Sequence, residues 1–343
     1  MWAMVVRGGE LMLEEVAQPA PGRGQVLARV RACGVCGSDL HALQYAAERG
    51  LDGVVMGHEF VAEVVEAGPG AESWKPGARV VCSPSMPPEG VLPPRAGDAP
   101  RNYLLMPGTR TIGYSKGYPG GFGEYVVLSA PLLISVPDHV PDRLAATTEP
   151  CAVGLHAVRQ AKVAPDEHVL VLGAGPIGLM TLLWLKRDGV CHVTVSEPSA
   201  PRRELAAKLG ADLVLDPRET DVRAALAEAI GGLPAVVFEC VGVPGTLQQA
   251  MDLAAIEGRV VVVGVCSAED RIMPRVGIGK QLTLQFVAAY TTAEIGAALA
   301  AIADGSIDTS PLITRTVTLE ELPEAFHALG DPQHCKVLVE FPG

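Results

Sequence analysis

Short hydrophobic runs fill roughly the first 140 residues, and glycines and prolines separate them. Examples are QVLARVRA at 25–32, EFVAEVVEAG at 59–68 and ARVVCS at 78–83. Valine-rich runs of this length, bounded by Gly and Pro, are typical of β-strands. We therefore predict a β-rich region up to about residue 150, interrupted by a long irregular loop over residues 83–121, where prolines and glycines are frequent.

From about residue 151 the pattern changes to strands that alternate with helices. HVLVLG at 168–173 precedes a helical pattern at 176–189, and similar pairs follow as far as RVVVVGV at 259–265. Continuous Val/Leu strands that alternate with helices indicate a parallel sheet covered on both faces. The predicted fold class is α/β, with a doubly wound parallel sheet over 151–290. The β-rich domain over 1–150 is completed by 291–343, which reads as two helices and a final strand.

A glycine-rich turn follows the first strand of the parallel region. Gly173, Gly175 and Gly178 have the spacing G-x-G-x-x-G between a strand and a helix. The first glycine permits the turn, the second lets a pyrophosphate approach, and the third lets the helix pack on the strand. Glu197 closes the next strand, about 20 residues further on, where a carboxylate can accept hydrogen bonds from an adenosine ribose. The alternative is a doubly wound sheet whose Gly-rich turn binds no nucleotide.

Composition and charge limit the class of partner. The chain of 343 residues has a formal net charge of -12, and nucleic acids and anionic membranes both require clustered Lys and Arg instead. Eight scattered cysteines do not resemble a disulfide framework. Acidic residues occur too early for a secretory signal, and no apolar run reaches membrane-spanning length. We predict a cytoplasmic protein with a small-molecule partner, no nucleic acid and no membrane.

Residues able to bind a metal are spread over the β-rich region. ACGVCGSDLH at 32–41 contains Cys33 and Cys36 in a C-x-x-C spacing, which fits a redox pair, half of a zinc knuckle or part of a catalytic site. His58 and Glu59 lie between two β-like runs, and Glu149 lies where the region ends. One thiolate, an imidazole and carboxylates from separate loops can form a catalytic zinc site with an open position. Taken alone, a GHE sequence is more often a solvated turn.

In combination these motifs resemble the zinc-dependent medium-chain dehydrogenases, near the sorbitol, threonine and secondary-alcohol dehydrogenase branches. The matching segments, in the order typical of that family, are GVCGSDLH, GHEFVAEVVEAG, PGARVV, GGFGEYVVL, TEPCAVGLHA and VLVLGAGPIG. The resemblance implies a β-rich GroES-like catalytic domain and a Rossmann domain. It also implies hydride transfer between an alcohol or ketone and NAD. Cys33 matches no ligand position, so the C-x-x-C is neither a redox pair nor a knuckle.

The resemblance also implies roles for individual residues. Cys36 and His58 correspond to zinc ligands, and Glu59 and Glu149 are two carboxylate candidates that the resemblance does not rank. Ser38 and His41 correspond to a proton relay, although His41 alone would read as a surface histidine. Asp39 would orient a ligand. The implied cofactor-binding residues besides the three glycines and Glu197 are Pro176, Ile177, Arg202, Val241, Gly264, Val265 and Ala289.

Two departures from the family pattern refine the prediction. Many relatives hold a second, structural zinc with four closely spaced cysteines, but the corresponding segment here has only Cys82. We therefore expect one catalytic zinc per chain and no structural zinc. No cluster of Lys or Arg that could hold a carboxylate or phosphate accompanies the ligands, so a neutral secondary alcohol or ketone is the leading substrate class and a polyol or amino alcohol is the alternative. A zinc-free reductase or a non-catalytic relative would lack the ligands or the glycines. Glu197 favours NAD over NADP, and the resemblance implies a homodimer or homotetramer.

Overall fold

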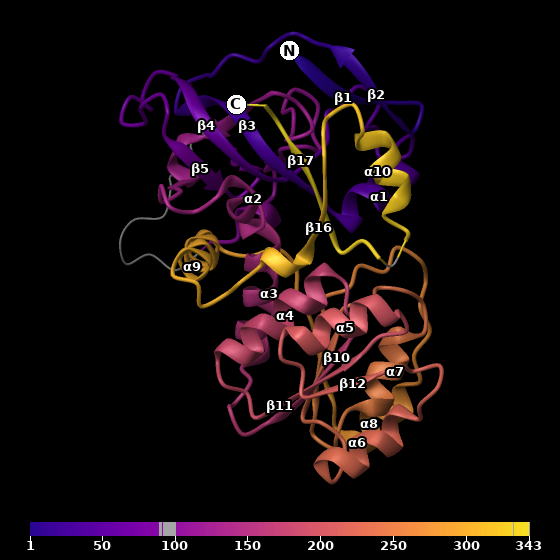
Figure 1. The fold of residues 1–343 in the computed structure, drawn as a ribbon. Coiled ribbons are helices and arrows are strands. Elements are labelled where there is room, and N and C mark those ends of the chain that lie inside the picture. The colour runs from indigo at the N-terminus through magenta and orange to yellow at the C-terminus, as the bar shows by residue number, and fades with distance from the viewer. Residues whose placement is uncertain (89–90, 92–100, 332, 343) are drawn as a thin grey trace. The chain divides into compact units, whose positions relative to one another are not determined.

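The computed structural model describes residues 1–88, 91, 101–331 and 333–342. They form two compact units, which we call unit 1 (Met1–Ala152 with Ala289–Gly343) and unit 2 (Val153–Ala288) (Figure 1). Among the described residues, no helix is long and apolar enough to cross a membrane.

Unit 1 is built on a seven-stranded sheet with the order β16-β17-β3-β4-β5-β9, in which β8 also pairs with β3. All neighbours are antiparallel except β16 and β17. A short hairpin of β1 and β2 forms a separate two-stranded sheet. The strands are β1 (Trp2–Arg7), β2 (Glu10–Glu15), β3 (Gln25–Val35), β4 (Glu59–Ala67), β5 (Arg79–Cys82), β6 (Ser85–Met86), β7 (Arg110–Thr111), β8 (Tyr125–Ser129), β9 (Leu133–Ser135), β16 (Ile313–Val317) and β17 (Lys336–Glu340).

Helices of unit 1 are few and short. Helix α3 (Thr148–Ala161) begins in unit 1 and continues into unit 2. The others are α1 (Gly37–Gln44), α2 (Asp142–Ala145), α9 (Thr292–Ala303) and α10 (Leu322–Ala328), with the 3₁₀ turns η1 (Tyr103–Leu105), η2 (Ala130–Leu132) and η3 (Ser310–Leu312).

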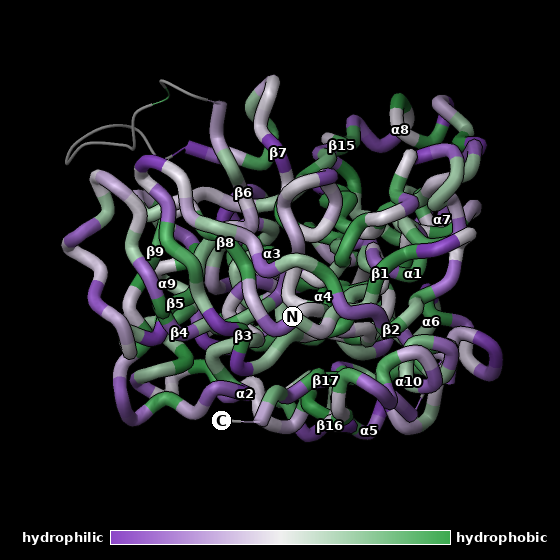
Figure 2. Tube along the Cα trace, turned by 90° about the horizontal axis from the view of Figure 1, so that it is seen from above, coloured by the Kyte–Doolittle hydropathy of each residue, from purple (hydrophilic) through white to green (hydrophobic). Residues whose placement is uncertain are grey.

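The core of unit 1 comes from the valine-rich strands that the sequence pattern predicted. In β3 and β4 nearly every apolar side chain is buried, and Figure 2 shows green, hydrophobic stretches among the strands of unit 1. The predicted irregular loop over 83–121 has more regular structure than expected, because β6 pairs with β7 and η1 lies between them in the chain. Part of that loop, residues 89–90 and 92–100, lies outside the described residues.

Unit 2 is a six-stranded, all-parallel sheet with the order β12-β11-β10-β13-β14-β15. This is the strand order 3-2-1-4-5-6 of doubly wound dinucleotide-binding folds. The predicted fold class, an α/β protein with a β-rich domain and a doubly wound parallel sheet, is confirmed. The elements are β10 (His168–Leu172), α4 (Pro176–Arg187), β11 (His192–Ser196), α5 (Ala200–Lys208), β12 (Leu213–Leu215), α6 (Val222–Ile230), β13 (Val236–Glu239), α7 (Thr246–Leu253), β14 (Arg259–Val262), α8 (Pro274–Lys280) and β15 (Thr283–Phe286).

Candidate metal and cofactor sites

Strand register in unit 1 brings the predicted metal ligands together. The antiparallel strands β3 and β4 are paired so that Gly34 lies opposite Glu59. Cys36 comes just after the end of β3, and His58 comes just before the start of β4. Because the end of one antiparallel strand lies beside the start of the next, residues 22 positions apart in sequence meet at one point.

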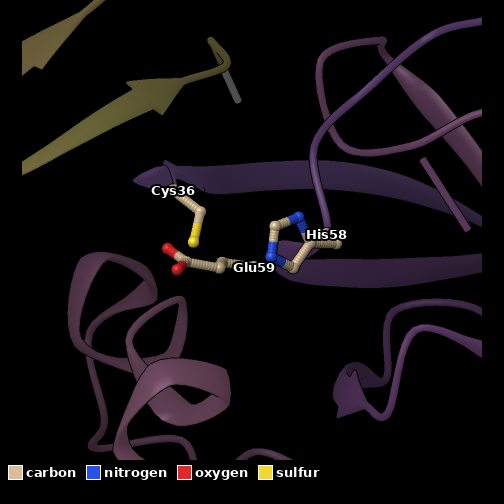
Figure 3. Close-up of side chains that lie close together, drawn as sticks. All are labelled: Cys36, His58 and Glu59. Carbon is tan, nitrogen blue, oxygen red and sulfur yellow. The ribbon is translucent and has the colours of Figure 1, made fainter. Parts of the chain in front are cut away.

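The side chains of Cys36, His58 and Glu59 point toward one another (Figure 3), and their ligand atoms all lie within 4.8 Å. Among the described residues, this is the one such group of His, Cys, Asp and Glu. Bond lengths to zinc put two ligands of one tetrahedral ion about 3–4 Å apart. A thiolate, an imidazole and a carboxylate at these separations therefore fit a zinc ion after small adjustments.

Negative charge surrounds the imidazole of this group. His58 Nδ1 lies 3.3 Å from Asp39 Oδ1, and the Asp39 carboxylate also accepts a hydrogen bond of 3.1 Å from the main-chain N–H of Cys36. Burial lowers the pKa of His58, but the charges and hydrogen bonds of Asp39 and Cys36 outweigh it, so that the pKa lies well above its usual value. The site thus stabilises positive charge, as a site for a divalent cation must.

Glu59 already has a cationic partner. Lys336, the first residue of β17, places its Nζ 2.9 and 2.7 Å from the two carboxylate oxygens, and both side chains are only 1% exposed. The same Nζ donates to the main-chain oxygen of Val35 at 3.2 Å. Burial lowers the pKa of Lys336, but the charge of Glu59 raises it above its usual value, so the pair is ionic.

The second carboxylate candidate, Glu149, lies outside the group of three. It is buried near the start of α3 and accepts a hydrogen bond of 2.6 Å from the hydroxyl of Tyr290. Burial is the main cause that raises its pKa to about 7, while the charge of His58 acts in the opposite direction. The charge of His58 lowers the pKa of Glu149, and the charge of Glu59 raises it. Glu149 therefore lies within electrostatic range of the metal-ligand group.

The two predicted relay residues differ in their surroundings. Ser38 is partly buried in the first turn of α1, and its Oγ lies 2.9 Å from the hydroxyl of Tyr114. Tyr114 also donates to Asp39 Oδ1 at 2.8 Å, and its ring centroid lies 5.3 Å from that of His58. His41 is exposed in the last turn of the same helix, so it meets solvent directly.

Three neighbours of the site were not predicted. Tyr114 comes from a segment without periodicity, and nothing in the sequence distinguishes it. For Lys336 the sequence did contain a signal. A lysine that begins the apolar run KVLVEF is costly to bury without a partner, so its position indicates a buried acidic partner. Tyr290 has no comparable signal.

Gly173, Gly175 and Gly178 lie where the fingerprint predicts, between β10 and α4 of unit 2. Gly173 has φ of +90°, a conformation that other residues rarely adopt. Gly175 caps α4, and Pro176 and Ile177 form its first turn. A Cβ on Gly178 would lie 2.0 Å from the oxygen of Gly173, whereas a Cβ on Gly175 would meet no atom within 4 Å. Gly178 therefore permits close packing, and Gly175 leaves space for a ligand.

Glu197 follows β11 and organises the turn beside it. One carboxylate oxygen accepts the N–H of Ala174 and the other accepts that of Ser199, both at 2.8 Å. Arg202 lies in the first turn of α5. A carboxylate here can bind ribose hydroxyls only through oxygens that already accept the N–H groups of Ala174 and Ser199.

The remaining predicted cofactor residues lie on three loops. Val241 and Val265 are exposed, at 43% and 65%, and the loops that carry them touch, because a Cβ on Gly264 would lie 2.4 Å from the nitrogen of Gly242. Ala289 has φ of +56° and is the first residue of the second segment of unit 1. Within unit 2 the structure groups Val241 with Gly264 and Val265, and Ala289 belongs to the other unit.

Two family models match the chain. One, described as an alcohol dehydrogenase GroES-like domain, matches residues 22–138, and the other, described as a zinc-binding dehydrogenase, matches residues 176–304.

Curated proteins and solved structures match over nearly the whole chain. The chain is 33% identical to an (R,R)-butanediol dehydrogenase of Bacillus subtilis, with 96% of each chain covered. It is 32% identical to a sorbitol dehydrogenase of Gallus gallus, covering 98% of this chain and 95% of the relative. It is 31% identical to an L-threonine 3-dehydrogenase of Sinorhizobium medicae, covering 96% and 95%.

Two of the similar solved structures contain a nicotinamide cofactor. An alcohol dehydrogenase of Escherichia coli complexed with NADH has a TM-score of 0.89 at 28% identity, with 99% of each chain covered. A zinc-binding dehydrogenase of Sinorhizobium meliloti bound to NADP has a TM-score of 0.88 at 31% identity, again with 99% of each chain covered.

Substituting Gly34 should disturb the metal-ligand group through Glu59. A Cβ on Gly34 would lie 2.2 Å from Glu59 Oε2, and Lys336 holds that carboxylate in place. We expect Gly34→Ala to destabilise the protein by about 1–3 kcal/mol, the usual cost of overpacking. It should also weaken zinc binding. Denaturant unfolding and competition with a chromogenic chelator measure the two effects.

The matched control is Gly37→Ala, since a Cβ on Gly37 meets no atom within 4 Å. It should change neither quantity appreciably. Equal effects of the two substitutions would contradict the close approach of Glu59 to β3.

Substitutions of Gly178 and Gly175 should have different effects, the first on the stability of the protein and the second on nucleotide binding. Gly178→Ala should lower the unfolding midpoint of the protein, because its Cβ collides with the main chain of Gly173. Gly175→Ala should leave the midpoint unchanged but weaken NAD binding, because its methyl group occupies the approach of the pyrophosphate. Denaturant unfolding and fluorescence titration with NAD provide the comparison. Unchanged NAD affinity in Gly175→Ala would argue against this turn as the nucleotide site.

Proposed function

Because the chain belongs to the zinc-dependent medium-chain dehydrogenases, we propose that it interconverts a neutral secondary alcohol and the corresponding ketone, with NAD(H) as the hydride carrier. The chain is an oxidoreductase of the alcohol dehydrogenase type that uses zinc and a nicotinamide cofactor. The secondary alcohol, the choice of NAD and the number of zinc ions are the proposed refinements.

The group of Cys36, His58 and Glu59 carries this proposal. Three mixed ligands at one point of unit 1 suit a catalytic zinc, which keeps a position open for substrate, better than a closed structural zinc. Glu149, buried and within electrostatic range of His58, is the second candidate carboxylate and could bind zinc directly or through water. The segment that follows Cys82 has no further cysteine before Cys151. This supports one catalytic zinc per chain and no structural zinc.

When bound, zinc supplies a Lewis acid that polarises the substrate oxygen, and NAD supplies the hydride acceptor. The protein itself handles the proton. Ser38, two residues from Cys36, accepts the hydroxyl proton of the substrate, and the exposed His41 exchanges it with solvent. Asp39 fixes the orientation of His58 through its carboxylate. Gly173, Gly175 and the N-terminus of α4 receive the pyrophosphate.

The names of the relatives favour a secondary hydroxyl. A butanediol with stereocentres at carbons 2 and 3 is oxidised at a secondary carbon, and so is threonine at carbon 3. Lys336, the lysine that the described residues place at the metal-ligand group, is engaged by Glu59. This supports an uncharged substrate. A polyol or amino alcohol, as in the sorbitol and threonine dehydrogenases, is the second candidate.

Electrostatics favour NAD over NADP. A phosphate about 4 Å from the Glu197 carboxylate would be repelled by about 4 kcal/mol per charge pair at an effective dielectric constant of about 20, before screening. Each ~1.4 kcal/mol is a factor of ten in affinity. Two nearby arginines, Arg203 and Arg218, each form an ion pair of 2.8 Å with Asp216. Asp216 thus compensates one of the two positive charges, and the other reduces the repulsion of a phosphate below this upper figure.

We also propose a homodimer or homotetramer in the cytoplasm. Strand β15 ends the parallel sheet in the described structure, and its last residue, Phe286, is 69% exposed. A strand with a free edge is a surface on which a second copy can pair. No disulfide joins any of the eight cysteines, which suits a reducing compartment.

Metal analysis tests the zinc assignment. Purified protein should contain one zinc per chain, and Cys36→Ser should lose the metal and nearly all turnover. NAD binding should persist, because the glycine-rich turn belongs to unit 2. Elemental analysis, steady-state kinetics and NAD titration give the three values. Two zinc ions per chain would contradict the single-metal proposal, and simultaneous loss of NAD binding would contradict the division of roles between the units.

The same zinc-loaded protein, assayed with NAD against a panel of alcohols, identifies the substrate class. Neutral secondary alcohols should have the highest kcat/KM. A preference for sorbitol-like polyols or for threonine would favour the second candidate, and no turnover with any alcohol would overturn the proposed function.

Replacing Glu197 should reduce the discrimination between cofactors. We expect kcat/KM to be at least about 100-fold higher with NAD than with NADP, and Glu197→Ser should reduce this ratio. The ratio is the relevant quantity, because Glu197 also holds the glycine-rich turn that both cofactors use. Glu204→Ser, which removes an exposed carboxylate from α5, should leave the ratio unchanged. A wild-type preference for NADP would refute the NAD assignment.

A further inference from the structure

Tyr114 connects two residues of the candidate active site that lie on α1. Its hydroxyl is 2.9 Å from Ser38 Oγ and 2.8 Å from Asp39 Oδ1. It comes from the segment between β7 and β8, which is far from both residues in sequence. The site as predicted from sequence contains no member from this segment.

Close main-chain packing fixes the segment that carries Tyr114. Gly113 has φ of +84°, and a Cβ there would lie 2.7 Å from the oxygen of Gly57, the residue before His58. The N–H of Tyr114 donates to Thr111, and that of Gly113 donates to Tyr118, both at 3.1 Å. Tyr114 is therefore held against the residues just before β4, which include His58.

The hydrogen bonds determine which atom donates to which. A phenol has one proton, and an ionised carboxylate can only accept. Tyr114 donates its proton to Asp39, so its oxygen is left as an acceptor. The Ser38 hydroxyl, 2.9 Å away, must then donate its own proton to Tyr114.

We propose that Tyr114 is a positioning residue for Ser38: its oxygen accepts a hydrogen bond from the Ser38 hydroxyl, which leaves a lone pair of the serine oxygen to accept a hydrogen bond from the hydroxyl of the alcohol substrate. This inference rests on the proposed function, because it assumes that Ser38 receives the substrate proton. Without Tyr114 the serine hydroxyl can rotate, and only a fraction of its orientations can accept. Removal of Tyr114 therefore changes the orientation of the Ser38 hydroxyl and leaves the metal ligands unchanged.

A different role would use the same contacts. Tyr114 could act through Asp39 on His58, whose ring lies 5.3 Å away between centroids, and so alter the metal ligands. The two roles differ in what they predict for the metal environment and for a variant that lacks Ser38.

The test is Tyr114→Phe, which keeps the ring beside His58 and removes only the hydroxyl. Zinc content should match wild type, while kcat and kcat/KM should both fall about tenfold, the value of one hydrogen bond. Tyr118→Phe is the control. It removes a hydroxyl from the same segment at a ring that is likewise partly buried against the core of unit 1, but the hydrogen bonds to Ser38 and Asp39 come from Tyr114, so its kinetics should equal wild type.

A double-mutant cycle assigns the effect to Ser38. In a Ser38→Ala background, Tyr114→Phe should cause no further loss of kcat, because the residue through which it acts is gone. The visible spectrum of the cobalt-substituted variant should match that of cobalt-substituted wild type.

Three results would overturn the inference. They are a kcat of Tyr114→Phe within twofold of wild type, losses that multiply with those of Ser38→Ala, or a changed cobalt spectrum, which would assign Tyr114 to the metal ligands. A wild-type protein that turns over no alcohol would refute the proposed function and this inference together. An active wild type with an equally active Tyr114→Phe would refute only the inference.

Discussion

The buried ion pair of Lys336 and Glu59 joins three strands at the candidate metal site. Lys336 begins β17, Glu59 begins β4, and the lysine also donates to Val35 at the end of β3. Burying two charges is unfavourable unless they are paired and hydrogen-bonded, and removing one partner typically costs about 3–5 kcal/mol. The pair therefore fixes where these strands begin and end, and with them the positions of Cys36 and His58.

This arrangement also explains why a glycine occupies position 34. The Glu59 carboxylate lies where a side chain on Gly34 would be, so the central strand must lack a Cβ at the point where it passes the ion pair. The C-x-x-C spacing of the sequence thus has a structural meaning apart from redox chemistry. Cys33 is fully buried in the core, Gly34 makes room for Glu59, and Cys36 follows as the ligand candidate.

How far the sequence predicts this protein depends on the range of the interactions. Valine-rich runs and the glycine fingerprint are local patterns, and they predicted the fold class, the strands β3 and β4 and the turn before α4. The pairing of Lys336 with Glu59 joins residues 277 positions apart, and no local pattern specifies such a pair. Tyr114 was missed for the same reason, because its contacts depend on how an irregular segment packs against Gly57. The roles of the predicted site residues stay predictions.

Both units use carboxylates to hold the main chain on which their sites depend. Asp39 accepts the N–H of Cys36, Glu197 accepts those of Ala174 and Ser199, and Glu239 accepts those of Val241 and Gly242. Charge-assisted hydrogen bonds of this kind are stronger than neutral ones. They shape the loops before any metal or nucleotide arrives. A ligand then meets a surface already ordered, so less of its binding energy is lost to fixing flexible loops.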